Sequence, residues 1–412
     1  MKILHVLAQM PGRTGSGVYF CNLIDQLKPC GAEQRALYAC QDGSAYDGLA
    51  QEACYPVCFK SPALPFPVPG MSDVMPYEST VYAHMDAAML EAWQAAFRRA
   101  LVQAKAEFAP DAVLLHHLWM LAALGVEVFE DALTIGICHQ TDIRQAQQHP
   151  ALKAACVQHL DRLDAVWALG EAQKPLIEEI YAVAPEKIVT MGVGYDANVF
   201  YPAEKPREAG PVRVVYAGKV VESKGVFELV RAFKGLGQNT PPCVLEIIGE
   251  PDAHHEALLA RLIGGDARIT VTPARSQADF AATLRQKDVF VMPSHYEGVG
   301  LVALEALACG LWTVSTRVEG LAALLGDVVN QSGAIAYVPP PRLHDVDKIE
   351  DAQRAVFTQA LCVALARQVE NVAAGRAFPR QVGPALAGHT WGGLASRAHG
   401  QIEQGLKTIK IT

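Results

Sequence analysis

The chain has 412 residues, of which 51% are hydrophobic and 19% are charged, and its formal net charge is −8. This length suggests about two or three domains, and this composition excludes an intrinsically disordered chain. The acidic balance argues against a nucleic-acid-binding protein, which would need a basic face. Ten cysteines without metal-ligand spacing, a start unlike a signal peptide and no run of about 18 apolar residues predict a cytoplasmic protein with at most peripheral membrane contact.

The chain opens with a predicted strand, a glycine-rich loop and a helix. Lys2–Leu7 has the apolar character of a buried strand, residues 12–17 read Gly-Arg-Thr-Gly-Ser-Gly, and Val18–Leu27 has the apolar spacing of a helix. This order is typical of a doubly wound α/β domain, whose first loop can pass close to a phosphate. The glycines can equally serve only to turn the strand into the helix. No Gly-Lys-Ser/Thr closes the loop, so it is not a P-loop.

A proline-rich segment, residues 60–80, interrupts the first half of the chain. Its five prolines exclude a helix and predict a stiff, extended excursion. Two interpretations stay open. The segment is either a surface loop or a wall on the acceptor side of a binding site, since long ordered loops often carry function.

Further along, a predicted strand ends in a histidine. Asp86–Phe108 has the pattern of a long amphipathic helix, and Leu133–Cys138 predicts another buried strand. His139 follows this strand directly, at the position where open parallel sheets place ligand-facing residues. His139 is therefore a candidate site residue, with a buried structural histidine as the alternative.

The second half begins after a polar, proline-containing stretch that predicts a linker over residues 198–211. Val212–Ala217 predicts a strand, followed by a loop that contains Lys219 and Lys224 and then by a helix through Ala232. Two cations at a strand's C-terminal end can hold a diphosphate and offset the charge of a leaving group. Strands are also predicted over residues 243–249 and 269–275, and the intervening histidine pair 254–255 reads as a solvated face and not as a metal site.

The stretch Val289–Gly310 is the most informative in the chain. A short apolar run, Val289–Met292, predicts a strand that Pro293 terminates, a glycine-containing loop follows, and a nearly all-apolar helix starts at Leu301. A lone carboxylate on such a helix, Glu305, is costly unless something hydrogen-bonds it. With Glu297 in the loop, the sequence predicts two carboxylates and a row of helix-start N–H groups around one small space, which suits a phosphate.

Residues 293–310 resemble the motif of retaining glycosyltransferases of the GT-B fold, of the kind grouped in family 4. That motif has two glutamates separated by seven residues, the spacing of Glu297 and Glu305. Further segments resemble the same family. Lys224-Gly225 matches its Lys-Gly pair, whereas Lys219 replaces its arginine, so the bidentate grip of that arginine is lost.

The resemblance spans nearly the whole chain and implies a GT-B fold, that is, two Rossmann-like doubly wound domains facing a central cleft. Residues 1–197 are expected to form the acceptor-side domain and residues 212–376 the nucleotide-sugar domain. Residues 377–412 are expected to cross back to the first domain, with a final helix from Trp391.

The resemblance also implies roles for individual residues. His139 and Glu297 are expected to be catalytic, and His117, Asp142 and Arg144 are acceptor-side candidates. The residues expected to bind the donor are Gly15, Ser16, Gly17, Lys219, Lys224, Gly298, Val299, Gly300, Leu301 and Glu305. No metal and no other cofactor is expected, because lysines take over the neutralisation of the diphosphate.

The implied reaction is retaining transfer of a hexosyl or N-acetylhexosaminyl group from a nucleotide-diphosphate sugar, with a UDP-sugar favoured. The acceptor is expected to be a small soluble molecule or a glycan. A nucleotide-sugar epimerase or hydrolase on the same fold is one alternative, and a non-catalytic partner protein that binds sugar nucleotides is another. A homodimer stays open.

Overall fold

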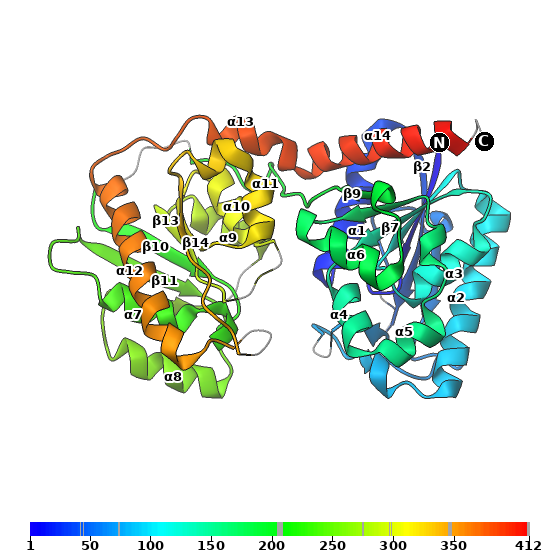
Figure 1. Cartoon of the computed structure of the whole chain (residues 1–412), viewed down its shortest axis with the longest axis horizontal. Helices are drawn as coiled ribbons and strands as arrows, with labels where there is room; N and C mark the ends of the chain where they lie inside the picture. Colours follow the sequence, from blue (N-terminus) through cyan, green and yellow to red (C-terminus); the bar gives the residue numbers. More distant parts are fainter. Residues whose placement is uncertain are drawn as a thin grey trace. The chain divides into compact units, whose positions relative to one another are not determined.

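The computed structural model of the chain describes residues 1–41, 43, 45–72, 75–203, 209–273, 276–295, 297, 299–344 and 348–409. These residues divide into two compact units, which we describe one at a time (Figure 1). Unit 1 contains residues 1–194 and 391–412, and unit 2 contains residues 195–390. The chain therefore passes between the units close to residues 194 and 390, compared with 197 and 377 in the domain boundaries expected from the sequence.

Unit 1 is built on a seven-stranded parallel sheet with the order β3-β2-β1-β6-β7-β8-β9. The strands are β1 Lys2–Leu7, β2 Glu33–Cys40, β3 Cys54–Cys58, β6 Ala112–His116, β7 Leu133–Cys138, β8 Ala165–Ala168 and β9 Ile188–Thr190. Two short strands, β4 Pro69–Gly70 and β5 Thr80–Val81, pair within the proline-rich segment. The helices are α1 Gly15–Leu27, α2 Ala87–Phe108, α3 Met120–Val128, α4 Thr141–Gln148, α5 Pro150–Cys156, α6 Lys174–Tyr181 and α14 Trp391–Ile409.

Local sequence explains where these elements begin. The Asp86 carboxylate caps α2 by accepting a hydrogen bond from the Met89 N–H at 2.8 Å. Helix α1 starts at Gly15, three residues before the predicted Val18, because Thr14 caps it. The last helix, α14, begins at Trp391 as predicted and packs on α1 (Figure 1, red on blue).

Unit 2 contains a six-stranded parallel sheet with the order β12-β11-β10-β13-β14-β15. The strands are β10 Val212–Ala217, β11 Cys243–Ile248, β12 Ile269–Thr272, β13 Val289–Met292, β14 Trp312–Thr316 and β15 Ile335–Val338. The helices are α7 Val226–Lys234, α8 Ala253–Ile263, α9 Gln277–Leu284, α10 Leu301–Ala308, α11 Glu319–Asn330, α12 Asp351–Ala373 and α13 Val382–Leu386. Helix α12 lies along α7 (Figure 1, orange).

Both sheets are doubly wound, and each has one point where the strand order reverses. In unit 1 this switch lies between β1 and β6, and in unit 2 it lies between β10 and β13. In open α/β sheets, ligands bind beyond the C-terminal ends of the strands at such switch points. The loops expected to bind a ligand are therefore those after β1 and β6 in unit 1, and those after β10 and β13 in unit 2.

Candidate functional site

The loops after β10 and β13 are fastened to each other at the switch point of unit 2. The His295 N–H donates a hydrogen bond to the Ser223 carbonyl oxygen at 2.9 Å. Gly225 has φ +65°, and a Cβ atom there would collide with the carbonyl oxygen of Pro293. Only glycine therefore allows this close approach of the two backbones.

This crossing brings Lys224 and Glu297 together. The Lys224 Nζ lies 2.6 Å from Glu297 Oε2, and their side chains are 29% and 27% exposed. A pair of this exposure is partly shielded from water, so it attracts more strongly than a fully solvated pair. The predicted lysine and the predicted loop glutamate thus share one space at the strand ends.

The other lysine of the same loop is placed differently. Lys219 is exposed, and its carbonyl oxygen accepts a hydrogen bond from the Tyr216 hydroxyl at 2.7 Å. Within the described part of the chain, no hydrogen bond or ion pair of the Lys219 ammonium group is found. The structure therefore shows no contact between Lys219 and the described Lys224–Glu297 pair, and contact of Lys219 with a diphosphate stays a prediction.

Helix α10 begins at the same edge of the sheet. Gly300, its N-terminal cap residue, has φ +75°, and a Cβ there would lie 2.6 Å from the Met292 Cε. The first N–H groups of an α-helix, here those of Leu301 and Val302, have no acceptor inside the helix and carry partial positive charge, whereas the Ala303 N–H donates to the Gly300 carbonyl oxygen at 2.9 Å. Val299 lies just before this turn and is half-buried, whereas Gly298 falls outside the described residues.

Glu305 is half-buried within α10. Burial raises the pKa of its carboxyl from 4.5 to about 8, although a side-chain hydrogen bond with Gln277 opposes the shift. At neutral pH this carboxyl is therefore mostly protonated in the ligand-free protein. The sequence predicts that an ionised group on this apolar helix is costly without a hydrogen-bonding partner. In the structure, Glu305 has Gln277 as such a partner.

In unit 1, His139 follows β7 and contacts His116 at the end of β6. The His139 Nε2 lies 3.1 Å from the His116 Nδ1, and the two rings are stacked at 14° with centroids 5.3 Å apart. Burial holds the pKa of both rings well below 6.5. Both imidazoles are therefore neutral, and one nitrogen of His139 is already engaged by His116.

His117 adds a third imidazole to this group. Its ring centroid lies 4.8 Å from that of His139, and burial lowers the pKa of His117 to about 4. His117 is almost fully buried and has φ +71°, and Gln140, which follows His139, has φ +72°. Such backbone strain tends to gather at functional sites.

Asp142 holds the two histidine-bearing loops in place. Its buried carboxylate accepts hydrogen bonds from the backbone N–H groups of Leu118, at 2.8 Å, and His139, at 3.1 Å. This geometry supports positioning of the loops, and direct contact with an acceptor stays a prediction. Arg144, on the same helix, is exposed.

The glycine-rich loop after β1 is shaped by its cap residue. The Thr14 hydroxyl accepts a hydrogen bond from the Gly17 N–H at 3.1 Å and lies 3.0 Å from the Ser16 hydroxyl. Gly17 packs against the loop itself, since a Cβ there would lie 2.8 Å from the Met10 carbonyl oxygen. Gly15 is the first residue of α1, so its N–H group has no acceptor within the helix.

Sequence reasoning missed Tyr19 and His116. The Tyr19 ring lies edge-on to His139, with centroids 5.3 Å apart, and edge-on to Trp391 at 5.4 Å. Tyr19 is buried in α1, where apolar spacing alone predicts a core residue. The signal for His116 was its place directly before His117 at a strand end, but only the structure shows that the His116 Nδ1 lies within hydrogen-bond distance of His139.

The proline-rich segment is anchored by three glutamines, two of them in the loops after β1 and β2 and one in helix α4. Gln9 donates to the Pro69 carbonyl oxygen at 2.6 Å and accepts from the Tyr77 hydroxyl at 2.8 Å. Gln41 accepts from the Val68 N–H at 3.0 Å, and Gln145 donates to the Met71 carbonyl oxygen at 3.2 Å. The segment therefore lies over the same edge as the histidine-bearing loops.

The described ranges contain neither a candidate metal site nor a helix that could span a membrane. No group of three or more His, Cys, Asp or Glu side chains is placed to hold a metal ion. None of the helices traced there combines the length and the apolar character that crossing a bilayer demands.

Two family models match the chain. The model described as "Glycosyl transferase 4-like domain" matches residues 14–194, and the one described as "Glycosyl transferases group 1" matches residues 200–352. The two matched ranges fall in units 1 and 2, respectively.

Curated relatives match part of the chain. A "D-inositol 3-phosphate glycosyltransferase" of Segniliparus rotundus is 27% identical over 53% of this chain and 54% of the relative. One of Arthrobacter sp. is 36% identical over 32% of this chain and 35% of the relative. A "Glycogen synthase" of Mycobacterium tuberculosis is 27% identical over 60% of each. The matches thus span between about a third and three fifths of the length of these relatives.

Solved structures match over nearly the full length. A sucrose-phosphate synthase from Thermosynechococcus elongatus has a TM-score of 0.68 at 18% identity, covering 98% of this chain and 99% of that one. Anabaena HepE in complex with UDP has a TM-score of 0.64 at 14% identity, covering 98% and 100%. At these identities the likeness establishes the fold. Together with the two family models, it shows that the chain belongs to the GT-B glycosyltransferases, in the family 4-like group.

Proposed function

We propose that the protein is a retaining glycosyltransferase that moves a sugar from a nucleotide-diphosphate sugar, preferably a UDP-sugar, to a small soluble acceptor. The observation that carries this proposal is the Lys224–Glu297 pair at the switch point of unit 2, beside the start of α10. A cation and helix-start N–H groups at one strand edge suit a diphosphate, and the neighbouring carboxylate suits sugar hydroxyls.

In this proposal, the ammonium group of Lys224 leaves the Glu297 carboxylate to meet the diphosphate, and Lys219 assists from its exposed loop. Glu297 then accepts hydrogen bonds from hydroxyls of the sugar, and the N–H groups of Val299, Gly300 and Leu301 donate hydrogen bonds to oxygen atoms of the donor. These groups stabilise negative charge as it builds up on the departing nucleoside diphosphate. A bound metal ion is not needed for this stabilisation.

Glu305 is proposed to bind the ribose. A half-buried carboxyl with a raised pKa is costly to ionise in the empty site. Two ribose hydroxyls donating to it would stabilise its ionised form, so nucleotide binding should release a proton from the protein near neutral pH.

In unit 1, His139 is proposed to position the donor sugar. Because His116 engages its Nε2, the Nδ1 is the ring nitrogen left for a ligand. Both rings are neutral, so this contact is a hydrogen bond and not a charge. The acceptor proton is proposed to pass to the departing phosphate, the route that fits retention without a protein nucleophile.

The acceptor is proposed to lie along the proline-rich segment of unit 1. Its anchoring by Gln9, Gln41 and Gln145 favours the acceptor-side wall over a loose surface loop. The names of the curated relatives suggest a phosphorylated polyol, D-inositol 3-phosphate, as the first acceptor to test. We place the reaction in the cytoplasm, where ten thiols stay reduced.

The test has two stages. Thermal shifts with UDP, GDP and ADP and their sugar derivatives should show stabilisation by one base, because a ligand that binds only the native form raises its stability. Release of nucleoside diphosphate is then measured with and without acceptors, including D-inositol 3-phosphate. Acceptor-dependent release supports transfer. Release at full rate without acceptor would support a hydrolase, and binding without turnover would support a non-catalytic partner protein.

A further inference from the structure

A carboxylate lies fully buried beneath the donor-side loops of unit 2. Glu228 is in the first turn of α7, and its side chain is 0% exposed. A buried carboxylate is costly unless it is paired and hydrogen-bonded. The groups that pair with the Glu228 carboxylate therefore indicate its role.

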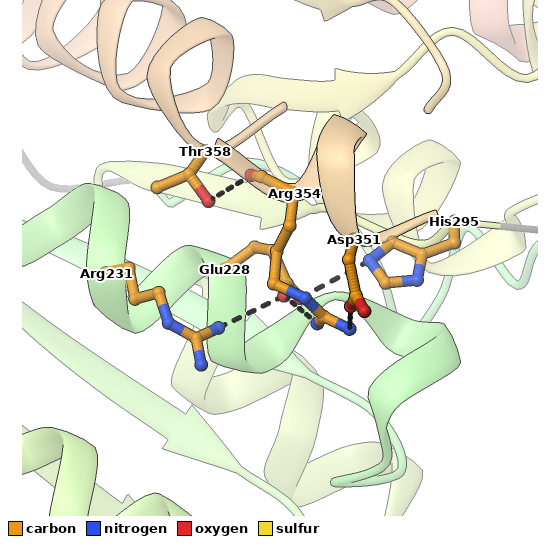
Figure 2. A network of polar contacts seen from close by, with 6 residues as sticks. All are labelled: Glu228, Arg231, His295, Asp351, Arg354 and Thr358. Carbon is orange, nitrogen blue, oxygen red and sulfur yellow. Dashed lines mark hydrogen bonds and ion pairs between the residues drawn. The ribbon is translucent and has the colours of Figure 1, made fainter. Parts of the chain in front are cut away.

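Two arginines neutralise this carboxylate (Figure 2). The Arg354 Nη1, from the first turn of α12, lies 2.6 Å from Glu228 Oε1, and the Arg231 Nη1 lies 3.1 Å from the same oxygen. Asp351 lies 3.6 Å from the Arg354 Nη2. Burial alone would raise the pKa of Glu228, but His295 and Arg354 hold it below its usual value. The carboxylate is thus ionised.

The other carboxylate oxygen faces His295. The Nε2 of this fully buried ring lies 3.3 Å from Glu228 Oε2, and Figure 2 shows the ring facing the carboxylate. Phe357 of α12 packs edge-on against the ring at 5.6 Å. The His295 N–H also donates to the Ser223 carbonyl, so the backbone of this residue is fixed, while its ring lies against the Glu228 carboxylate and Phe357.

The chain connects this fixed point directly to the donor pair. Ser223 precedes Lys224, and His295 comes two residues before Glu297. Both partners of the 2.6 Å ion pair therefore lie within two residues of the hydrogen bond between the His295 N–H and the Ser223 carbonyl oxygen. A shift of the His295 ring would move that bond and, with it, the alignment of Lys224 and Glu297.

We propose that Glu228 is a positioning residue for the donor. Its ionised carboxylate, held by Arg354 and Arg231, keeps His295 in place and so aligns Lys224 and Glu297 for the nucleotide sugar. This inference rests on the proposed function of that pair. Glu228 touches no substrate, and it acts through His295 alone.

The test compares Glu228→Gln with a matched control, Glu256→Gln, which removes an exposed charge from α8. Glu228→Gln keeps the size of the side chain but removes the charge that holds His295. Because small misplacements in an active site cost up to about a hundredfold in rate, we expect the donor KM to rise about tenfold. The acceptor KM should stay within twofold, and Glu256→Gln should change neither constant.

A second measurement needs no substrate. The His295 amide donates to Ser223, so its hydrogen exchange in the ligand-free protein reports the bond between the loops. Glu228→Gln should speed this exchange about tenfold, while amides of the core strand β10 keep their wild-type rates. This result would hold even if the wild-type protein transferred no sugar, which would refute the proposed function separately.

Two outcomes would overturn the positioning role. One is an unchanged donor KM together with unchanged exchange of the His295 amide. The other is a lower melting temperature with reduced kcat but unchanged KM values, which indicates only a loss of folded enzyme. If Glu228→Gln does not fold, Glu228→Asp keeps the charge on a shorter side chain, and it should raise the donor KM less than tenfold while still speeding the exchange.

Discussion

The loops that carry the candidate site residues differ in charge between the two units. In unit 2, two ion pairs accompany the backbone hydrogen bond that joins the loops: Lys224 with Glu297, and, beneath them, Glu228 with Arg354. In unit 1, the loops after β6 and β7 are held by a neutral histidine pair and by backbone N–H groups donating to Asp142. The difference matches the division of labour that we propose. A diphosphate needs a cation that can exchange one anion for another, whereas a sugar needs fixed hydrogen bonds.

Removing the cation should have the largest effect. Lys224→Ala is expected to lower kcat/KM by about 10²–10³, the usual cost of losing one group that stabilises transition-state charge. It also removes the ammonium group that lies 2.6 Å from Glu297. Steady-state kinetics with the donor identified by thermal shift would measure this loss.

The matched control is Lys28→Ala, which breaks an exposed ion pair with Asp25 at 2.7 Å in unit 1. Exposed pairs contribute little, so activity and stability should stay close to wild type. If Lys224→Ala retained at least a third of the wild-type activity, the role assigned to the unit 2 ion pair would be wrong.

The next effect is on stability. Gly225→Ala places a methyl group against the Pro293 carbonyl oxygen at a residue with φ +65°. Overpacking and strain of this kind cost about 3 kcal/mol together, and the loops after β10 and β13 should separate. Urea unfolding would measure this loss. Gly237→Ala, at a site with nothing within 4 Å of the added Cβ, should unfold at the wild-type urea concentration.

Glu305 should make the free energy of unfolding depend on pH above neutrality, where the histidine pair of unit 1 contributes no such dependence. With a folded-state pKa of about 8 against 4.5 when unfolded, the folded protein binds an extra proton in this window. Stability should therefore fall as pH rises from 4.5 to 8, by up to about 1.4 kcal/mol per pH unit for this group.

Glu305→Gln removes this titration, so it should flatten the pH profile of unfolding and stabilise the ligand-free protein above pH 8. Unfolding curves of both proteins between pH 5 and pH 9 would measure the difference. If the pH profiles of the two proteins ran parallel, the raised pKa of Glu305 would be contradicted. A smaller thermal shift of the variant with nucleotide would support the proposed ribose contact.

The smallest predicted effect comes from unit 1. His116→Phe fills the same space but removes the Nδ1 that lies 3.1 Å from His139. We expect transfer to fall about tenfold, since a residue that orients a catalytic group typically contributes this much. His5→Phe is the control, because His5 is equally buried but bonds Gln34 instead. Equal losses of transfer in the two variants would show that the unit 1 pair has no special role.

Much of the fold follows from the sequence alone. Four strands, β1, β7, β10 and β13, have the bounds predicted from their apolar runs, because buried parallel strands carry uninterrupted apolar side chains. The start of α1 was wrong by three residues, because a threonine cap overrides apolar spacing.

The site was predictable only in part. The proximity of Lys224 and Glu297 follows from the order of the strands, since each residue comes after one of two neighbouring strands. Glu228 was not predictable. Its arginine partner Arg354 is 126 residues away, and its charge looks solvated until α7 and α12 pack together. Local pattern carries no information about such long-range pairing.

The glutamine anchors of residues 60–80 have a consequence for how this enzyme family can diversify. Most of their hydrogen bonds are made with main-chain atoms of the segment, which every amino acid carries. Natural variation or a laboratory graft can therefore rewrite the side chains along this stretch while the attachment points remain. With the acceptor along this segment, as we propose, such changes would alter acceptor preference without rebuilding the sheet beneath.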